Sequence, residues 1–589
     1  MKKKHPSWRA LSLAVIFVLL FCLVALRLFY WQVLAGERLN DLAKGQYHFQ
    51  KEIPALRGEI LAADGSPLIT NQKAYLLYSS LPNLNQPAEK IASLLAPFLV
   101  SETDSETSFS GDLKIDQTIK KEKVKEEQED LVTKLELNDM VWIALQHRLP
   151  EEVKQKIESL DLKGIGFEEE AVRFYPEASM AAHLLGFVGK DEEGKDIGYS
   201  GLEGFYDIEL KGRPGLMSLE KDALNEPILI GSFFSQERKD GQSLILHLDR
   251  TVQFIVERKL KEAVEKYKAK SGSVVIMNPE NGGVVALADY PSFDPKKYYQ
   301  YDKSLFKNSV ISDAYEPGST FKIFVMAAAI DNKAVKPETK CDICDKPFKI
   351  DKYEIKTWDE KYYPNSNMSE VIQHSDNLGM VFTARKLGFE DFWNYLNNFG
   401  FGEQTKIDLQ GEISASLRQR EKWSEVDLVT AAFGQGIATT GIQMIRACAA
   451  VANGGKLLEP HVVEKIISGE KTIDIKPKVI RQVIQPKTAK IITEMMVQAV
   501  EEGEAKYLKI PGFKIAGKTG TSQIPVAGHY DEEKTIASFI GFAPASKPKF
   551  VMLVKLREPG TSPWGSETAA PLFFSISREL LIYYGVQPD

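Results

Sequence analysis

The chain has 589 residues, of which 43% are hydrophobic and 26% are charged, a composition typical of a globular protein with more than one domain. The formal net charge of -7 provides no basic surface for a nucleic acid, so no nucleic-acid partner is expected. Four cysteines are too few for a disulfide scaffold, and the eight scattered histidines show no metal-ligand spacing. We therefore expect neither a metal nor another cofactor.

The N-terminus carries the first interpretable element. Basic residues precede an apolar, charge-free run (residues 10–26), and aromatic residues follow it. This pattern is typical of a single transmembrane helix whose N-terminus stays in the cytoplasm. We expect residues 1–35 to form the leader and the anchor, with residues 10–34 in contact with the membrane and the remainder outside the cytoplasm. A signal peptide cleaved near residues 33–35 is the alternative.

The next region, residues 36–240, mixes short strand-like and helical patterns with turns that contain Gly and Pro. Within it, residues 101–134 form a biased segment, because ten acidic and five basic residues lie between Glu102 and Asp130 with few large apolar ones. Such a composition predicts a solvated, flexible insertion with no binding role.

From about residue 241 to the end of the chain, predicted strands and helices alternate. Residues 243–248 favour a strand, residues 251–268 a helix, residues 273–277 a buried strand, and residues 573–584 a final helix. This alternation predicts an α/β or α+β domain over residues 241–589.

The segment Glu316–Lys322 carries a nucleophile and a candidate base. A Pro-Gly turn is followed by a strongly helix-forming stretch, so Ser319 and Lys322 lie three residues apart at a helix start. A serine hydroxyl needs a base beside it to attack at neutral pH. A lysine in such an apolar helix start would be desolvated and spend part of its time neutral. On its own, a Ser-x-x-Lys pair is more often a capping serine with a solvated lysine.

Two further motifs follow. Ser375-Asp-Asn377 supplies a hydroxyl and an amide within a helical pattern that continues to Leu387. Lys518-Thr-Gly-Thr521 follows an apolar approach, residues 513–516, that predicts a strand. The latter motif also matches the P-loop pattern GxxxxGK[ST], but a P-loop needs a helix directly after it, and the glycines and proline that follow make a poor helix start. An NTPase is therefore not expected.

The order Ser-x-x-Lys, Ser-Asp-Asn, Lys-Thr-Gly is the set found in penicillin-binding proteins and class A β-lactamases. Behind a predicted anchor, the chain resembles the class B penicillin-binding proteins from residue 8 to its end, the charged insertion excepted. Pedestal segments of the family are matched at Arg57–Ile60, Arg173–Pro176, His183–Gly186 and Gly201–Gly204. The resemblance implies an α+β multidomain protein with one transmembrane helix (1–35), an elongated pedestal (36–240) and a transpeptidase domain (241–589) in which helices flank an antiparallel sheet.

The resemblance also implies a serine D,D-transpeptidase that cross-links peptidoglycan stem peptides and is inhibited by β-lactams. Ser319 would form the acyl-enzyme with Lys322 as its base. Ser375 would relay a proton to the leaving amine, helped by the positive charge of Lys518. Asn377 would bind the substrate amide. The terminal carboxylate would be held by Thr519, Gly520 and Thr521, and the backbone N–H groups of Ser319 and Thr521 would form the oxyanion hole.

His374–Met380 resembles the division-type members more than the elongation-type members. This implies septal cell-wall synthesis, with a SEDS-family glycan polymerase and other membrane proteins of the division complex as partners. The elongation type is the alternative. A membrane-anchored β-lactam hydrolase or sensor is a further alternative, but such a protein would not need the pedestal. A catalytically silent scaffold is another, but a silent protein would not need to keep all three motifs intact.

Some residues depart from the family pattern or stand beside it. Asp376 occupies a position where many class B members have serine. Cys341 and Cys344 cannot complete a zinc site alone, so either a local disulfide or two free thiols is expected. His374, Tyr315 and Trp358, which lie close to the motifs, are expected to have structural or cleft-lining roles.

Overall fold

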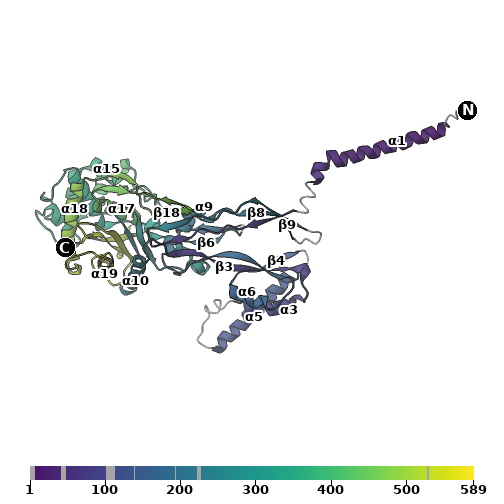
Figure 1. Ribbon diagram of the computed structural model, residues 1–589. Helices are drawn as coiled ribbons and strands as arrows, with labels where there is room; N and C mark the ends of the chain where they lie inside the picture. Colours follow the sequence, from purple (N-terminus) through teal and green to yellow (C-terminus); the bar gives the residue numbers. More distant parts are fainter. Residues whose placement is uncertain are drawn as a thin grey trace. The chain divides into compact units, whose positions relative to one another are not determined.

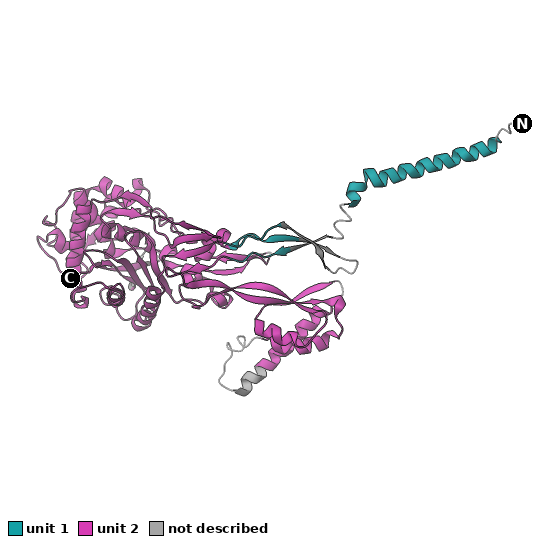
Figure 2. Cartoon of the chain, viewed as in Figure 1, with its two compact units in different colours: residues 1–57, 211–241 teal, residues 58–210, 242–589 magenta. Residues whose placement is uncertain are grey.

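The computed structural model describes residues 7–40, 48–100, 113–137, 140–192, 194–221, 227–526 and 529–588. The chain divides into two compact units (Figure 2): one comprises residues 1–57 and 211–241, the other residues 58–210 and 242–589.

The first unit contains an apolar helix and a small sheet (Figure 1). The helix α1 (Trp8–Phe29) continues as a π-helical turn (Tyr30–Leu34), and none of its side chains is buried. Together they are long and apolar enough to cross a membrane, which no other helix in the described part of the chain is. The sheet has the antiparallel order β1–β8–β9, with strands β1 (His48–Ile53), β8 (Gly215–Lys221) and β9 (Pro227–Gln236).

The second unit is built around a five-stranded antiparallel sheet. In spatial order its strands are β12 (Val284–Tyr290), β11 (Ser271–Met277), β23 (Phe550–Arg557), β22 (His529–Ala543) and β21 (Ala516–Val526). The predicted buried strand at residues 273–277 is confirmed as part of β11, and β21 forms one edge of the sheet.

The two faces of this sheet carry separate cores, because successive strand side chains point to opposite faces. Val274 and Ile276 of β11 belong to the core formed with helices α10 (Arg250–Tyr267) and α19 (Ala569–Tyr583). Their neighbours Val275 and Met277 belong to the opposite core, which includes α17 (Gly441–Ala452). Both α10 and α19 confirm helices predicted from sequence periodicity.

A group of helices shares that opposite core, and these helices carry the first two motifs. They are α12 (Lys322–Asp331), α13 (Met368–Gln373), α14 (Asn377–Leu387), α15 (Phe389–Asn398), α16 (Glu425–Ala431) and α18 (Pro486–Glu501).

A second sheet in this unit has the order β19–β18–β10–β2–β3–β4, with β5 also paired to β3. Its strands are β2 (Ile60–Leu61), β3 (Pro67–Ser80), β4 (Trp142–Leu149), β5 (Ile165–Phe174), β10 (Ser243–Leu246), β18 (Val463–Ser468) and β19 (Lys471–Asp474). The predicted strand at 243–248 is thus confirmed as β10, which pairs in parallel with β2 and antiparallel with β18.

Two of the pedestal segments meet in a buried ion pair. Nε of Arg173, at the end of β5, lies 2.8 Å from Oε1 of Glu203, whose side chain is fully buried. Arg173 Nη1 also donates to Oδ1 of Asn71. A carboxylate buried this deeply requires such charge-assisted hydrogen bonds.

The charged insertion differs from its prediction. Residues 101–112 lie outside the described residues, but Leu113–Leu135 form a helix, α5, and not a flexible loop. Leu131 and Leu135, one turn apart, are buried against the core that includes α3 (Ala88–Leu99). Val124, which packs against the same core, lies on the same helix face as Leu131 and Leu135, and the overall charge of the segment concealed this short apolar row.

Candidate active site

Ser319 lies in a 3₁₀ turn, η5 (Gly318–Phe321), which leads directly into α12. The predicted helix start is therefore confirmed, although the first turn is 3₁₀. Gly318 has a φ of +57°, and a Cβ atom placed there would lie 2.8 Å from the backbone oxygen of Thr521. A glycine at this position lets the turn that carries Ser319 approach strand β21 closely. The Ser319 side chain remains half-buried.

Lys322 is fully buried and joins the first two motifs. Its Nζ donates hydrogen bonds to the backbone oxygen of Ser375 (2.5 Å), to Oδ1 of Asn377 (2.8 Å) and to Oγ of Ser375 (3.3 Å). Burial, reinforced by the positive charge of Lys518, lowers the pKa of Lys322 from 10.5 to about 7. A lysine in this environment is partly neutral at physiological pH, as the sequence predicted.

Ser375 lies between two helices and not within one, which corrects the predicted continuous helical pattern. Helix α13 ends at Gln373, Ser375 adopts a φ of +58°, and α14 begins at Asn377. The break arises because Oδ1 of Asp376 accepts a hydrogen bond from the N–H of Leu378 and so caps α14. The resulting turn directs both the carbonyl and the hydroxyl of Ser375 towards Lys322.

Asp376 is almost completely buried, and its second carboxylate oxygen, Oδ2, has no hydrogen-bond partner among the described residues. Burial raises the pKa of Asp376, while the N–H of Leu378 and the charge of Lys322 act in the opposite direction. The charge of Asp376 in turn raises the pKa of Lys322, against the effect of burial. The adjacent Asn377 donates through Nδ2 to the backbone oxygen of Lys356 at 3.0 Å.

The third motif lies on edge strand β21. The strand begins at Ala516, so the predicted strand at 513–516 starts three residues too early. A Cβ atom on Gly520 would lie 2.6 Å from Oγ of Ser538 and 2.7 Å from Cγ2 of Thr320. Thr521 Oγ1 accepts a 2.9 Å hydrogen bond from the N–H of Gly565. The first and third motifs therefore pack directly on each other.

Lys518 is buried, and its Nζ donates to Oγ1 (3.1 Å) and O (3.3 Å) of Thr519. The Thr519 hydroxyl in turn donates a 2.7 Å hydrogen bond to Oε2 of Glu504. Burial lowers the pKa of Lys518, and the negative charge of Glu504 opposes that shift. Sequence reasoning missed Glu504, which belongs to no motif and lies in the turn after α18.

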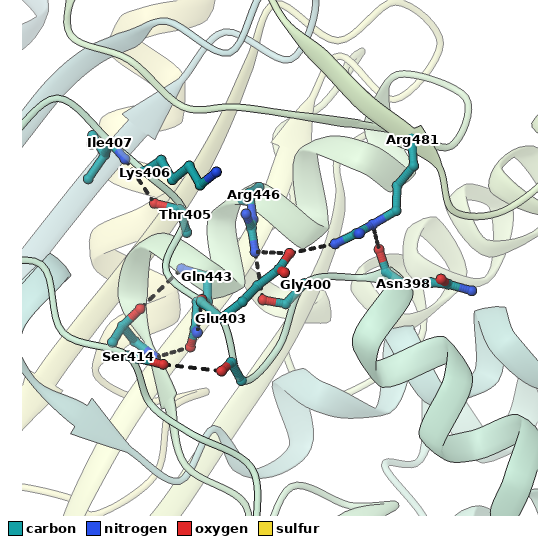
Figure 3. Close-up of polar contacts among 12 residues, drawn as sticks. Asn398, Gly400, Glu403, Thr405, Lys406, Ile407, Ser414, Gln443, Arg446 and Arg481 are labelled. Atoms are coloured by element: carbon teal, nitrogen blue, oxygen red, sulfur yellow. Dashed lines mark hydrogen bonds and ion pairs between the residues drawn. The ribbon is translucent and has the colours of Figure 1, made fainter.

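A polar network around Arg446 was also missed by sequence reasoning (Figure 3). The buried guanidinium of Arg446, on α17, donates a 2.6 Å hydrogen bond to the backbone oxygen of Gly400. Glu403 lies 3.8 Å from Arg446 and accepts a 2.5 Å hydrogen bond from Arg481.

A residue next to this network makes aromatic contacts with the neighbours of Lys322. Phe401, next to Gly400, lies 4.9 Å from the ring of Phe321 and 5.4 Å from that of Phe324. The network thus supports the helix that carries the candidate base.

The remaining candidates have structural contacts. The His374 ring stacks on Tyr363 with a centroid distance of 4.1 Å, and the His374 carbonyl accepts a hydrogen bond from Nε1 of Trp358. Tyr315 is buried under the ammonium of Lys555 at 4.5 Å. Cys341 and Cys344 form a disulfide, which decides between the two alternatives left open by the sequence.

The structure thus brings the three motifs together: Lys322 contacts Ser375 and Asn377, and the turn of Ser319 packs against the strand that carries Lys518, an arrangement that suits a serine acyl transferase. Residues 272–578 match the family described as the penicillin-binding protein transpeptidase domain, and residues 52–246 match the penicillin-binding protein dimerisation domain. The chain therefore belongs to the class B penicillin-binding proteins and is a peptidoglycan D,D-transpeptidase, as its sequence predicted.

Curated relatives and solved structures agree with this assignment. Stage V sporulation protein D of Bacillus subtilis is 34% identical over 586 residues, which cover 98% of this chain and 86% of that protein. The peptidoglycan D,D-transpeptidase FtsI of Escherichia coli K12 is 30% identical over 76% of this chain and 73% of its own length. Penicillin-binding protein 2X of Streptococcus thermophilus shares the fold, with a TM-score of 0.73 at 22% identity, over 91% of this chain and 80% of that one.

Proposed function

We propose that Ser319 is the nucleophile of the transpeptidase and that Lys322 is its base. The observation that carries this assignment is the environment of Lys322, buried beside Ser375 and Asn377 with a pKa lowered to about 7. A neutral amine has two N–H donors, which suffice for the oxygens of Ser375 and Asn377, and one lone pair remains to accept a proton. Ser319 would then attack the D-Ala-D-Ala carbonyl, release the last alanine and form an ester. The amine of a second stem peptide takes over the acyl group and frees Ser319.

Ser375 would relay a proton to the leaving amine, and the 3.3 Å distance between its hydroxyl and Lys322 Nζ supports this role. Asn377 would bind the substrate amide. Lys518 supplies positive charge near the terminal carboxylate, which Thr519, Gly520 and Thr521 would hold along β21. An edge strand suits this role, because its outer N–H and C=O groups have no partner strand.

The oxyanion hole would consist of the backbone N–H groups of Ser319 and Thr521. The close contact between Gly318 and Thr521 supports this, since it places the turn of Ser319 directly against the edge strand. Removing one such donor from an acyl-transfer enzyme costs about 10²–10³ in rate.

The same attack would open a β-lactam and leave a stable ester on Ser319. Intact-mass measurement after incubation with a penicillin should show one adduct that maps to Ser319. Ser319→Ala should show none, and Lys322→Ala should acylate far more slowly because the hydroxyl loses its base. Rapid turnover of a chromogenic β-lactam, without a persistent adduct, would favour the hydrolase alternative and contradict this proposal.

We also assign a membrane topology and three domains to the chain. Residues 1–35 are the cytoplasmic leader and anchor, residues 36–240 the pedestal and residues 241–589 the transpeptidase domain outside the cytoplasm. The apolar helix Trp8–Leu34 and the basic residues before it support this orientation. A reporter that works only outside the cytoplasm should be active when fused near Gln50, and activity of a cytoplasmic reporter at that position would overturn the topology.

The cellular role we propose is septal cell-wall synthesis with a SEDS-family glycan polymerase and other division-complex membrane proteins as partners. The resemblance of His374–Met380 to the division type supports it, and a relative named for sporulation suggests that the septum is made in division or in sporulation. Depletion should block septa and give filaments, or arrest sporulation alone if the role is restricted to it. Rounded, swollen cells would indicate the elongation type.

A further inference from the structure

Glu504 is a charged residue outside the third motif, and its carboxylate contacts that motif. Glu504 Oε2 accepts a 2.7 Å hydrogen bond from the hydroxyl of Thr519, and that hydroxyl accepts a 3.1 Å hydrogen bond from Lys518 Nζ. No carboxylate oxygen of the described residues lies within the ion-pair distance of 4.0 Å of Lys518. The counter-charge of Lys518 therefore acts through the Thr519 hydroxyl.

The backbone holds Glu504 in this place. It follows Gly503, where a Cβ atom would lie 2.7 Å from the backbone oxygen of Gln373 at the end of α13. It precedes Ala505, which is buried in the core beneath the sheet. The turn is thus fixed between the helix that leads to Ser375 and the strand that carries Lys518.

This geometry conflicts with the binding of an anionic ligand. While the Thr519 hydroxyl donates to Glu504, its single proton is not available to the carboxylate of a stem peptide. A substrate carboxylate that reaches Lys518 and Thr519 must turn that hydroxyl away from Glu504 and take over the role of counter-charge.

We propose that Glu504 is a positioning residue that occupies the carboxylate-binding pair Lys518–Thr519 in the resting enzyme and gives it up to the carboxylate of the ligand. The inference rests on the proposed roles of Lys518 and Thr519. It assigns Glu504 two effects: it orients the Thr519 hydroxyl before binding, and it keeps Lys518 charged while no ligand is present.

The effect of Glu504 on the charge of Lys518 predicts a change in the pH dependence of acylation. A purely structural role of Glu504 would not produce this change. The charged groups that act on the two buried lysines are Asp376 at the start of α14, Glu504, and the lysines themselves. Glu504 raises the pKa of both Lys518 and Lys322, against the effect of burial. Acylation requires neutral Lys322 and charged Lys518. Its rate therefore falls when the pH lies below the pKa of Lys322 and when it lies above the pKa of Lys518. Removing the charge of Glu504 lowers both pKa values and moves both limbs of the profile to lower pH.

The test is the second-order rate constant for acylation of the full chain in detergent by a fluorescent penicillin, from pH 5 to pH 10. Glu504→Gln keeps the side-chain shape and removes the charge, so both limbs should move to lower pH and rate should be lost on the alkaline side. The acid limb should move less, because Glu504 affects the pKa of Lys322 less than Asp376 does. Glu504→Asp retains the charge and withdraws it from Thr519, so the limbs should stay near their wild-type positions while the maximum rate falls.

Glu502→Gln is the matched control, because Glu502 is an exposed carboxylate in the same turn, and its profile should equal that of the wild type. Limbs that stay in place in Glu504→Gln, with only a lower maximum, would overturn the proposal. Failure of the proposed function looks different: the wild type itself would then form no stable adduct at Ser319. If Glu504→Gln does not fold, Glu504→Asp still decides, since limbs that move although the charge is kept would contradict the assignment.

Discussion

The Nζ atom of Lys322 donates a 2.5 Å hydrogen bond to the backbone oxygen of Ser375. This contact ties the candidate base to a turn that has a positive φ and lies between two helices. The ammonium form can satisfy three acceptors there, whereas the neutral form satisfies two and offers a lone pair. In the proposed mechanism, the balance between the ammonium and the neutral form of Lys322 sets the pH range in which Ser319 can be acylated.

The first prediction concerns pH. Burial and the charge of Lys518 lower the pKa of Lys322 to about 7, and only the neutral amine can accept a proton. The acylation rate should therefore rise through this pKa, about tenfold per pH unit on the acid side, and level off above it. Stopped-flow acylation by a penicillin between pH 5 and pH 8 measures the profile. A rate that is constant over this range would exclude Lys322 as the titrating base.

The second prediction concerns Asp376, whose negative charge raises the pKa of Lys322. Asp376→Asn should move the acid limb to lower pH, so that acylation near pH 6 becomes faster relative to its maximum. The capping of α14 should survive, because Asn caps helices as well as Asp does. Unlike Glu504→Gln, this variant should leave the alkaline limb in place, since Glu504 is the carboxylate that acts on Lys518.

Asp249→Asn is the control for Asp376→Asn. Asp249 caps α10 in the same manner, through hydrogen bonds from the N–H groups of Thr251 and Val252. Its substitution should leave the pH profile unchanged. An acid limb that moves equally in both variants would show that the shift does not come from the charge beside Lys322.

Much of the fold was predictable because the signals are local. Periodicity identified α10, β11 and α19, since each buries residues at the spacing of its own element. The three motifs predicted the candidate site, because their residue types and order together indicate the chemistry, and the structure brings them together. The highly charged composition of residues 101–134 predicted a flexible insertion. That prediction was wrong at α5, where the buried side chains of Leu131 and Leu135 pack the helix against the core.

The remaining features depend on contacts that no local pattern contains. The Ser375 turn was hidden by helix-forming neighbours on both sides, and the Asp376 cap that creates it resembles an ordinary helical residue. Glu504 and Arg446 act on residues 15 and 46 positions away in the chain, the second through a backbone carbonyl that carries no side-chain signature. Such pairings become visible only once the strands and helices are placed.

The third prediction concerns Arg446. Arg446→Ala leaves the buried Gly400 carbonyl without its donor and Glu403 with one partner fewer, so it should destabilise the domain by about 3 kcal/mol. Acylation should slow as well, because Phe401 supports the rings of Phe321 and Phe324 beside Lys322.

Thermal melting and acylation rates of the same samples check both effects. Arg481→Ala is the control: Arg481 binds the same Glu403 but is one-third exposed, and its loss should cost less than about 1 kcal/mol. Equal losses of stability in Arg446→Ala and Arg481→Ala would show that the buried guanidinium of Arg446 contributes no more to stability than the partly exposed one of Arg481.

The last prediction separates backbone strain from the close approach of two motifs. Gly318 and Gly469 have nearly the same φ, +57° and +60°. Alanine in this left-handed region costs about 1–2 kcal/mol at either position. A Cβ atom at Gly469 meets nothing within 4 Å, whereas one at Gly318 would lie 2.8 Å from the backbone oxygen of Thr521. Gly469→Ala should therefore lower the melting temperature slightly and leave acylation unchanged. Gly318→Ala should lose more stability and acylate at least about tenfold more slowly, because the turn that carries Ser319 must move away from the strand that carries Thr521, the proposed second oxyanion donor. Equal acylation rates in the two variants would show that the contact between Gly318 and Thr521 does not position the nucleophile.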